Sequence, residues 1–151
     1  MAVSLGTVTS SNFINQTWNN VYVVVNTISD PLSRGWANWI TSAFPQERKG
    51  TADVYPLIVI DSGNFTGNNI TFTHANRLYN VNIPISVYAT RMDTVDGLSS
   101  TLAATLNAYR ATFDVYGMTN FNIEDTPIAH AIIAGQVVHQ KNINITLEEY
   151  V

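Results

Sequence analysis

The chain has 151 residues, a formal net charge of −4 and no cysteine. At roughly 150 residues per domain, this length predicts one domain spanning residues 1–151. Without cysteine, the chain cannot form a disulfide bond, a thiolate nucleophile or a cysteine-based metal site. Seven basic residues against eleven acidic ones disfavour a protein that binds nucleic acid through a basic face.

The fraction of charged residues is unusually low. Asp, Glu, Lys and Arg together make up 12 % of the chain, about half the ~25 % of ordinary soluble domains. Asn and Thr are abundant in their place, so much of the surface must be polar but uncharged. Interfaces between identical subunits are depleted in charge at their centres. The composition therefore favours a subunit of a homo-oligomer, and the alternative is a weakly charged monomer.

Two helices are predicted in the N-terminal part, over residues 10–44. In residues 10–28, apolar side chains recur at spacings of three and four, which is the helical period. A second helix is predicted to begin at Asp30 as the N-cap, with Pro31 at its first position. Trp36 and Trp39 lie on its apolar stripe and are expected in the core or an interface. Trp18 lies off the stripe of the first helix and is expected at the surface.

The rest of the chain alternates between strand and helix patterns. Strands are predicted at residues 57–60, 70–73, 81–90, 120–123 and 136–147, with a turn over residues 61–69. Pro84 cannot donate to a ladder, so it indicates a sheet edge or a local break. One long helix is predicted over residues 93–113, and Gly117 stops it. This order indicates an α+β fold, with helices packed on an antiparallel or mixed sheet.

No catalytic constellation is found. The chain has no glycine-rich phosphate loop, no GxSxG turn and no HExxH motif. His130 and His139 are expected to share a strand but not a face, and His74 lies far from both in sequence. Asp53 and Asp61 flank a predicted buried strand, but aspartates at loop ends usually bond their own turn. No catalytic, metal-binding or cofactor-binding residue is therefore expected.

One known family has a similar layout. The segments YPLIVID and IPISVYA, the helix around DTVDGLSSTLAATLNAY and a late closing strand follow an N-terminal helix. Over about residues 55–151 this order resembles the tail terminator or tail completion proteins of tailed phages and related viruses, including head–tail joining proteins. The likeness is one of layout and hydrophobic texture, without a diagnostic motif.

This resemblance implies a virion structural protein without catalytic residues. Its subunits would form a closed homomeric ring, typically a hexamer, that ends the tail tube and joins it to the head connector. The expected partners are further copies of the chain, the tail tube protein and the connector protein. DNA would pass through the lumen without sequence-specific binding. Assembly would occur in the host cytoplasm, and no signal peptide or membrane span is visible in the sequence.

Other functions remain open. The N-terminal third has two predicted helices and a pair of tryptophans, which is more than the minimal fold of that family contains. A tail-tube subunit or a head-completion ring of the same virion therefore remains an alternative role. A monomeric module that binds carbohydrate or another ligand would use exposed aromatic side chains. A small α+β enzyme would need a pocket with convergent polar groups.

Two segments are expected to contact partners or neighbouring subunits. The loop at residues 46–53 has the densest mixed charge, including Arg48, Lys49 and Asp53. A tail over residues 148–151 is expected to leave the last strand. The candidate contact residues are Trp18, Arg48, Lys49, Asp53, Glu148, Glu149 and Tyr150.

Overall fold

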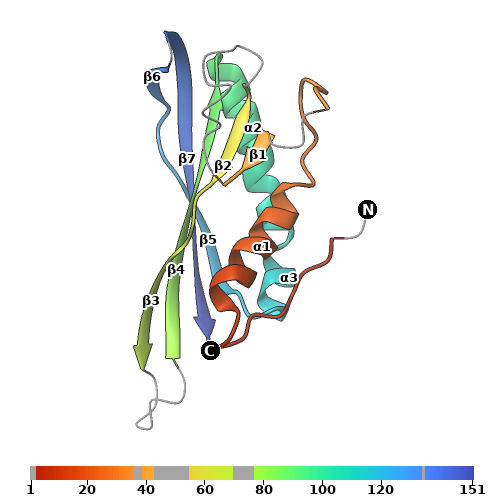
Figure 1. Ribbon diagram of the computed structural model, residues 1–151, viewed down its shortest axis with the longest axis vertical. Coiled ribbons are helices and arrows are strands. Elements are labelled where there is room, and N and C mark those ends of the chain that lie inside the picture. The colour runs from red at the N-terminus through yellow and green to blue at the C-terminus, as the bar shows by residue number, and fades with distance from the viewer. Residues whose placement is uncertain (1–2, 36–38, 43–54, 70–76, 134) are drawn as a thin grey trace.

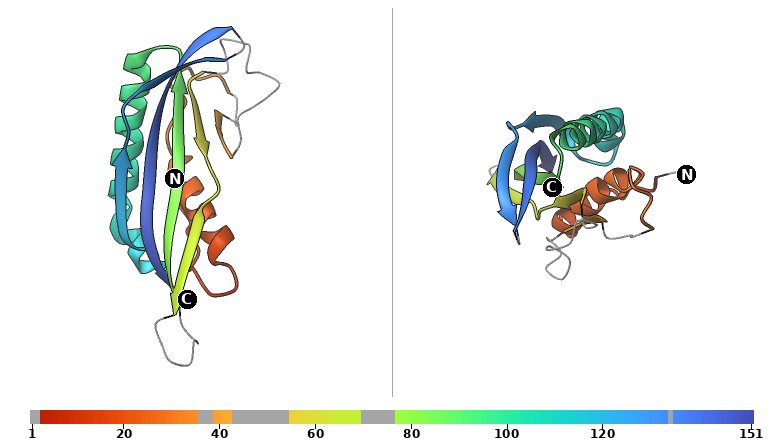
Figure 2. Two further views of the ribbon diagram at one scale, coloured as in Figure 1. Left: turned by 90° about the vertical axis from the view of Figure 1, so that its left-hand side faces the viewer. Right: turned by 90° about the horizontal axis from the view of Figure 1, so that it is seen from above.

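Over the residues that the computed structural model describes, three helices cover one face of a seven-stranded mixed sheet (Figures 1 and 2). The structure describes residues 3–35, 39–42, 55–69, 77–133 and 135–151. The predicted α+β fold, with helices packed on a mixed sheet, is confirmed. The helices are α1 (Phe13–Val25), α2 (Met92–Ala108) and α3 (Arg110–Val115). The strands are β1 (Ile40–Thr41), β2 (Leu57–Ile60), β3 (Asn64–Asn69), β4 (Arg77–Ala89), β5 (Thr119–Asp125), β6 (Ala129–Ile133) and β7 (Gln136–Tyr150).

Two long strands, β4 and β7, form the centre of the sheet. They pair antiparallel from Leu78 opposite Tyr150 to Ala89 opposite His139. The main strand order is β1-β2-β4-β7-β5; β3 also pairs with β4, and β6 also pairs with β7. The short β1–β2 pair is parallel, and the other described pairs are antiparallel. One side of the sheet is thus completed by β2 and β3, and the other by β5 and β6.

The main core lies between the helices and the sheet. Alternate residues of β4 and β7 point toward the helices, as the period-two pattern predicts, and meet the apolar stripes of α1 and α2. The fully buried side chains in this layer include Val21 and Val24 of α1, Leu102 and Leu106 of α2, and Ile83, Ile85, Ile143 and Ile145 of the sheet. A smaller cluster on the opposite face contains Tyr55, Leu57 and Val138.

The predicted first helix is confirmed as α1, but the predicted second helix is wrong over the described residues. Ser33 and Gly35 have φ angles of 49° and 68°, which a right-handed helix does not allow. Asp30 instead organises a turn, because its carboxylate accepts from the backbone N–H groups of Leu32 and Arg34. Ile40 then lies in β1, beside β2.

The predicted long helix at residues 93–113 is two consecutive helices. The chain departs from helical geometry at Tyr109, with φ −98° and ψ 5°, and α3 follows directly. Leu106 before the break and Phe113 after it are both fully buried. The apolar stripe read from the sequence therefore continues across the break.

The predicted turn at residues 61–69 is mostly the strand β3. Gly67 allows this pairing, because a Cβ there would lie 2.6 Å from the ring of Tyr79 on β4. Pro84 lies in the central strand β4. Of the two possibilities that the sequence predicted for it, a sheet edge or a local break, the pairing beside it fits the local break. β2 ends opposite Ile85, and β3 begins opposite Asn82. Pro84 therefore faces the gap between them, where its missing N–H leaves no ladder bond unmade.

The C-terminal strand is longer than predicted. β7 continues to Tyr150, so Glu148 and Glu149 belong to the ladder and do not leave it as a tail. β6 was not predicted, and it forms a hairpin with β7 around Gly135, whose φ is +79°. The predicted strand at residues 70–73 lies outside the described residues.

Candidate interaction surface on the open face of the sheet

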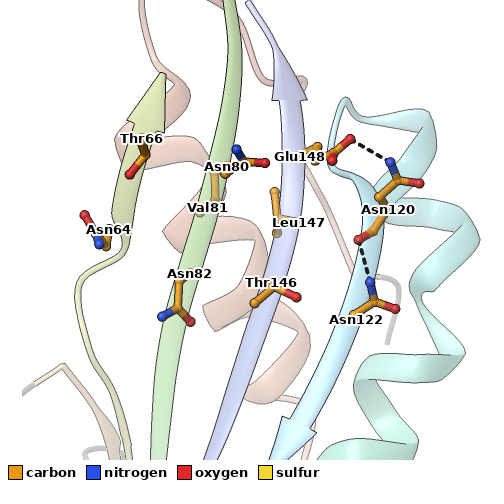
Figure 3. A pocket seen from close by; sticks show the side chains of 10 residues that line it. All are labelled: Asn64, Thr66, Asn80, Val81, Asn82, Asn120, Asn122, Thr146, Leu147 and Glu148. Atoms are coloured by element: carbon orange, nitrogen blue, oxygen red, sulfur yellow. Dashed lines mark hydrogen bonds between the residues drawn. The ribbon is translucent and has the colours of Figure 1, made fainter. Parts of the chain in front are cut away.

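The face of the sheet opposite the helices carries a continuous polar surface, called here the amide face. It is defined by the outward side chains of four strands around a shallow hollow of about 530 Å³ (Figure 3). These side chains are Asn64 and Thr66 of β3, Asn80 and Asn82 of β4, Asn120 and Asn122 of β5, and Thr146 and Glu148 of β7. Strand alternation brings them together, since every second residue of each strand points to this side.

Hydrogen bonds hold the side chains in place on the β5 side of the amide face. The side-chain amide of Asn120 donates to Oε2 of Glu148 at 2.6 Å, and that of Asn122 donates to the carbonyl oxygen of Asn120 at 3.4 Å (Figure 3). Thr119 donates its hydroxyl to the backbone oxygen of Glu148 at 2.9 Å. The bonds from Thr119 and Asn120 connect β5 to β7 through side chains as well as through the ladder, whereas the bond between Asn122 and Asn120 lies within β5.

The polar surface extends along the sheet beyond the hollow. Ser86 of β4 lies 2.9 Å from Oδ1 of Asn142 on β7, and the amide of Gln140 donates to the same oxygen at 2.9 Å. At the far end the small apolar cluster of Tyr55, Leu57 and Val138 covers this side of the sheet. The amide face is therefore a strip along β4 and β7, bounded by apolar side chains at one end.

Charge is sparse on this strip. At the outward positions of the described strands, the charged residues are Glu124 and Glu148, and both are acidic. Lys141 of β7 points to the helix side, where it lies 3.2 Å from Asp125 and 3.8 Å from Asp96. Amide and hydroxyl groups can both donate and accept hydrogen bonds. The amide face can thus contact a hydrated polar partner but offers no cation for an anionic one.

Two of the open strand edges lie on opposite sides of the sheet. Within the described residues, β3 pairs only with β4, and β5 pairs only with β7. An unpaired edge presents a row of N–H and C=O groups that can pair with another chain. Because the two open edges flank the amide face, a second copy placed at either edge would extend that face.

Trp18 lies on the helix side, away from the amide face. Its indole donates to the carbonyl oxygen of Ile60 at 3.3 Å and stacks on Tyr22 with 5.1 Å between ring centroids. It is half-buried, so the expectation of a free surface tryptophan is only partly met. Together with the exposed Ile14 it lines a second hollow of about 540 Å³, bordered by Asp61.

The other predicted contact residues do not form one site. Glu148 belongs to the amide face, and Tyr150 is 59 % exposed at the end of β7. Glu149 is fully buried, which rules out the expected partner contact. Its side chain follows the inward alternation of β7 and meets Thr17 of α1. Arg48, Lys49 and Asp53 lie outside the described residues.

The histidine expectation is also corrected. His130 and His139 lie on two different strands, directly opposite each other in the β6–β7 pair. The expectation placed them on one strand because β6 was not recognised. His74 lies outside the described residues. No cluster of three or more potential metal ligands occurs in the part of the chain that the structure describes.

The amide face was not predicted as a site, although its signal was present. The sequence alternation already placed Asn82 and Ser86 on one side of a strand, and Asn142, Asn144 and Thr146 on one side of another. What the pattern did not give was the pairing of these strands, which turns two polar stripes into one surface.

Comparison with known proteins gives no match, either to a protein-family model or to a curated protein. The described helices include none that is long and apolar enough to cross a membrane.

Proposed function

We propose that the chain is a virion structural subunit that closes into a homomeric ring at the end of a tail tube and joins it to the head connector. Terminator, tail-tube and head-completion rings are variants of this role, and the terminator is our first choice. The proposal starts from the resemblance in element order. It is supported by a sheet that keeps all three described helices on one face and leaves the other face open.

The observation that carries the proposal is the pair of open edges on either side of the amide face. If β3 of one subunit lies beside β5 of the next, each contact uses two different surfaces of the chain. Such a head-to-tail contact closes into a ring when the rotation between neighbours permits it. Closure also removes unpaired edges, which otherwise promote uncontrolled aggregation. The chain has a long sheet with open edges and few charged residues that would repel other copies. A closed ring accounts for both features.

In this ring the amide face would line the channel, and α1, α2 and α3 would lie outside. DNA binds proteins mainly through contacts between its phosphates and Lys or Arg. The outward positions of the described strands carry two acidic residues, Glu124 and Glu148, and no basic one. A lining of this kind would let DNA pass without retaining it, which agrees with a head–tail conduit.

A monomeric ligand-binding module is the second candidate, because the same hollow of about 530 Å³ carries convergent amide groups. It needs no contact between copies. The two proposals therefore differ in whether the edges β3 and β5 meet in solution.

Cysteine cross-linking tests this contact cleanly, because the natural chain has no cysteine. In the double variant Thr66→Cys and Asn122→Cys, the two new thiols lie on β3 and β5 of the same subunit. Three strand spacings separate them, about 14 Å at ~4.8 Å each. A short bismaleimide should therefore join neighbouring subunits and not the two thiols of one chain.

We expect the double variant to give a ladder of covalent oligomers that stops at the ring number, and each single variant to stay largely uncoupled. The matched control pairs Thr66→Cys with Thr101→Cys, which lies exposed on α2, and should not give the ladder. Equal cross-linking of the control, or only monomers in the double variant, would contradict the ring.

A further inference from the structure

Two histidines face each other across the β6–β7 hairpin. His130 of β6 and His139 of β7 are register partners, and their Nδ1 atoms lie 2.6 Å apart. The rings meet edge to face, with 4.6 Å between centroids and 82° between planes. Since the contact is at the exposed end of the sheet, solvent and small ions can reach it.

The short distance requires a proton between the two rings. Two bare imidazole nitrogens repel each other, so one Nδ1 must carry the hydrogen that the other accepts. In the neutral pair, one ring is then the Nδ1–H tautomer and the other the Nε2–H tautomer. The accepting Nδ1 thus directs its lone pair toward the Nδ1 of the other ring. That second Nδ1 gains a free lone pair when its own ring changes to the Nε2–H tautomer.

The charged groups around the pair do not oppose a cation. On the same face of β7, Lys141 is held between Asp125 of β5 and Asp96 of α2. Beyond Ala89, the register partner of His139, Arg91 is paired with Asp93 at the start of α2. The next pair on the same face toward the tip, Ile132 opposite Val137, is apolar. The two nearby basic side chains that the structure describes are thus each matched by at least one carboxylate.

We propose that His130 and His139 form a two-imidazole site for a divalent cation of the zinc, copper or nickel class. Imidazole nitrogen is a preferred ligand of these ions. A tetrahedral ion bound at 2.0–2.1 Å from each Nδ1 needs the two atoms about 3.3 Å apart. Small rotations of the exposed His130 and the partly buried His139 side chains supply the difference. Water completes the coordination, so the site is weaker than one with three or four protein ligands.

The proton balance is simple. The ring that carries hydrogen on Nδ1 loses it from that atom and holds one on Nε2 instead, so a neutral pair binds the ion without net proton release. A protonated pair must give up its extra proton first, and binding therefore weakens in acid. The ion would join β6 to β7 near the hairpin tip that presents Ile132 and Val137. The site uses one chain only and does not depend on the proposed ring.

The test is titration of the full chain with zinc alone, followed by calorimetry at pH 7.5 and pH 5.5. We expect saturable binding of one zinc ion per chain at pH 7.5 and weaker binding at pH 5.5. His130→Gln and His139→Gln should each weaken the affinity at least about tenfold, equivalent to about 1.4 kcal/mol. The matched control His74→Gln, which alters the third histidine of the chain, should bind like the natural protein.

Melting curves without zinc show whether each variant is folded, and a second readout is the zinc-induced rise of the melting temperature. That rise should appear in the natural protein and in His74→Gln, and disappear in both hairpin variants. Equal zinc affinity in the natural protein and the two hairpin variants would overturn the proposal. Absence of saturable binding up to about 1 mM zinc, the weak end of specific binding, would overturn it as well.

Discussion

Thr17 of α1 and Glu149 of β7 are hydrogen-bonded to each other, and both side chains are fully buried between the helix and the sheet. The Thr17 hydroxyl also lies 2.6 Å from the carbonyl oxygen of Phe13, one turn earlier in α1. A hydroxyl has one proton to donate. If that proton goes to Phe13, the Glu149 carboxyl must donate the other hydrogen bond and is therefore protonated. The second carboxyl oxygen, Oε1, has no hydrogen-bond partner in the structure.

Glu149 should make the protein less stable as the pH rises. Burial raises the pKa of its carboxyl from 4.5 to about 7 in the folded chain. Between these values the folded state holds a proton that the unfolded state has released, so stability falls with pH. The stabilisation is fully present below about pH 4.5 and is lost through pH 7, with a loss on the order of 3 kcal/mol. Chemical denaturation at pH 5.0, 6.0, 7.0 and 8.5 measures this slope.

Glu149→Gln is the matched variant for that slope, because it keeps the shape and a donor while removing the titration. Its stability should stay nearly flat between pH 5 and pH 8.5 and exceed that of the natural protein at the alkaline end. An unchanged slope in this variant would show that other groups cause the pH dependence. If the stability of the natural chain instead rose with pH over this range, Glu149 would be charged in the folded state.

The Asp30–Arg34 pair should contribute to stability far more than an ordinary surface pair. Its N–O distance is 2.9 Å, with side chains only 10 % and 12 % exposed, and Arg34 also donates to the carbonyl oxygen of Pro56 at 2.8 Å. Burial alone would raise the pKa of Asp30, but hydrogen bonds from Arg34 and from backbone N–H groups lower it overall. Asp30→Ala leaves those donors without their acceptor and should cost about 2 kcal/mol, measured by urea unfolding.

The control for Asp30 is the exposed pair of Arg91 and Asp93, which has the same 2.9 Å N–O distance but side chains 75 % and 68 % exposed. Asp93→Ala should leave the unfolding midpoint nearly unchanged, because solvent screens such pairs. Similar losses in both variants would mean that burial does not decide the contribution of the Asp30 pair.

Asn20 should hold the N-terminal segment against the helices. This residue is buried in α1, and its amide bonds both backbone groups of Gly6, at 3.0 Å from the N–H and 2.9 Å to the carbonyl. Asn20→Leu removes both bonds and leaves a partly buried backbone pair unsatisfied, at a cost of about 1–3 kcal/mol. Hydrogen exchange should accelerate at Gly6 and at Val8, whose N–H bonds Tyr116. Unchanged exchange at both would show that other contacts hold the segment.

Basic residues on the amide face should create DNA binding. The double variant Asn82→Lys and Asn144→Lys places two cations at outward positions of β4 and β7. It should bind duplex DNA with an affinity that falls steeply as salt rises, while the natural protein shows little binding. A matched control, Thr101→Lys with Thr105→Lys on α2, adds the same charge on the helix side. Equal binding by both double variants would show that net charge alone matters.

Part of the fold could be predicted from local periodicity. The spacing of Val21 and Val24 predicted α1, and the alternation around Ile83 and Ile85 predicted the centre of β4, because in both cases local pattern and tertiary packing agree. The helix predicted after Asp30 failed because apolar spacing suits a helix only if the backbone permits one. Ser33 and Gly35 adopt positive φ angles instead, which no spacing rule reveals.

The settings of Glu149 and of the two hairpin histidines were harder to predict for a different reason. Glu149 was placed in a tail over residues 148–151, because two acids and an aromatic residue follow the apolar alternation of the last strand. The strand in fact continues, and the buried partner Thr17 is 132 residues away. The opposition of His130 and His139 likewise depends on a hairpin that was not recognised. Contacts of this kind follow from strand pairing, which the sequence alone specifies only weakly.

Native mass spectrometry of the assembled protein tests the central proposal most directly. We predict one discrete species whose mass is a fixed multiple of 16.7 kDa, six-fold if the resemblance holds in detail. Its subunit number should stay constant over about a tenfold dilution, because a closed ring cannot grow or shorten by single subunits. A protein that stays monomeric at tens of micromolar, alone and beside its tail or connector partners, would contradict the account.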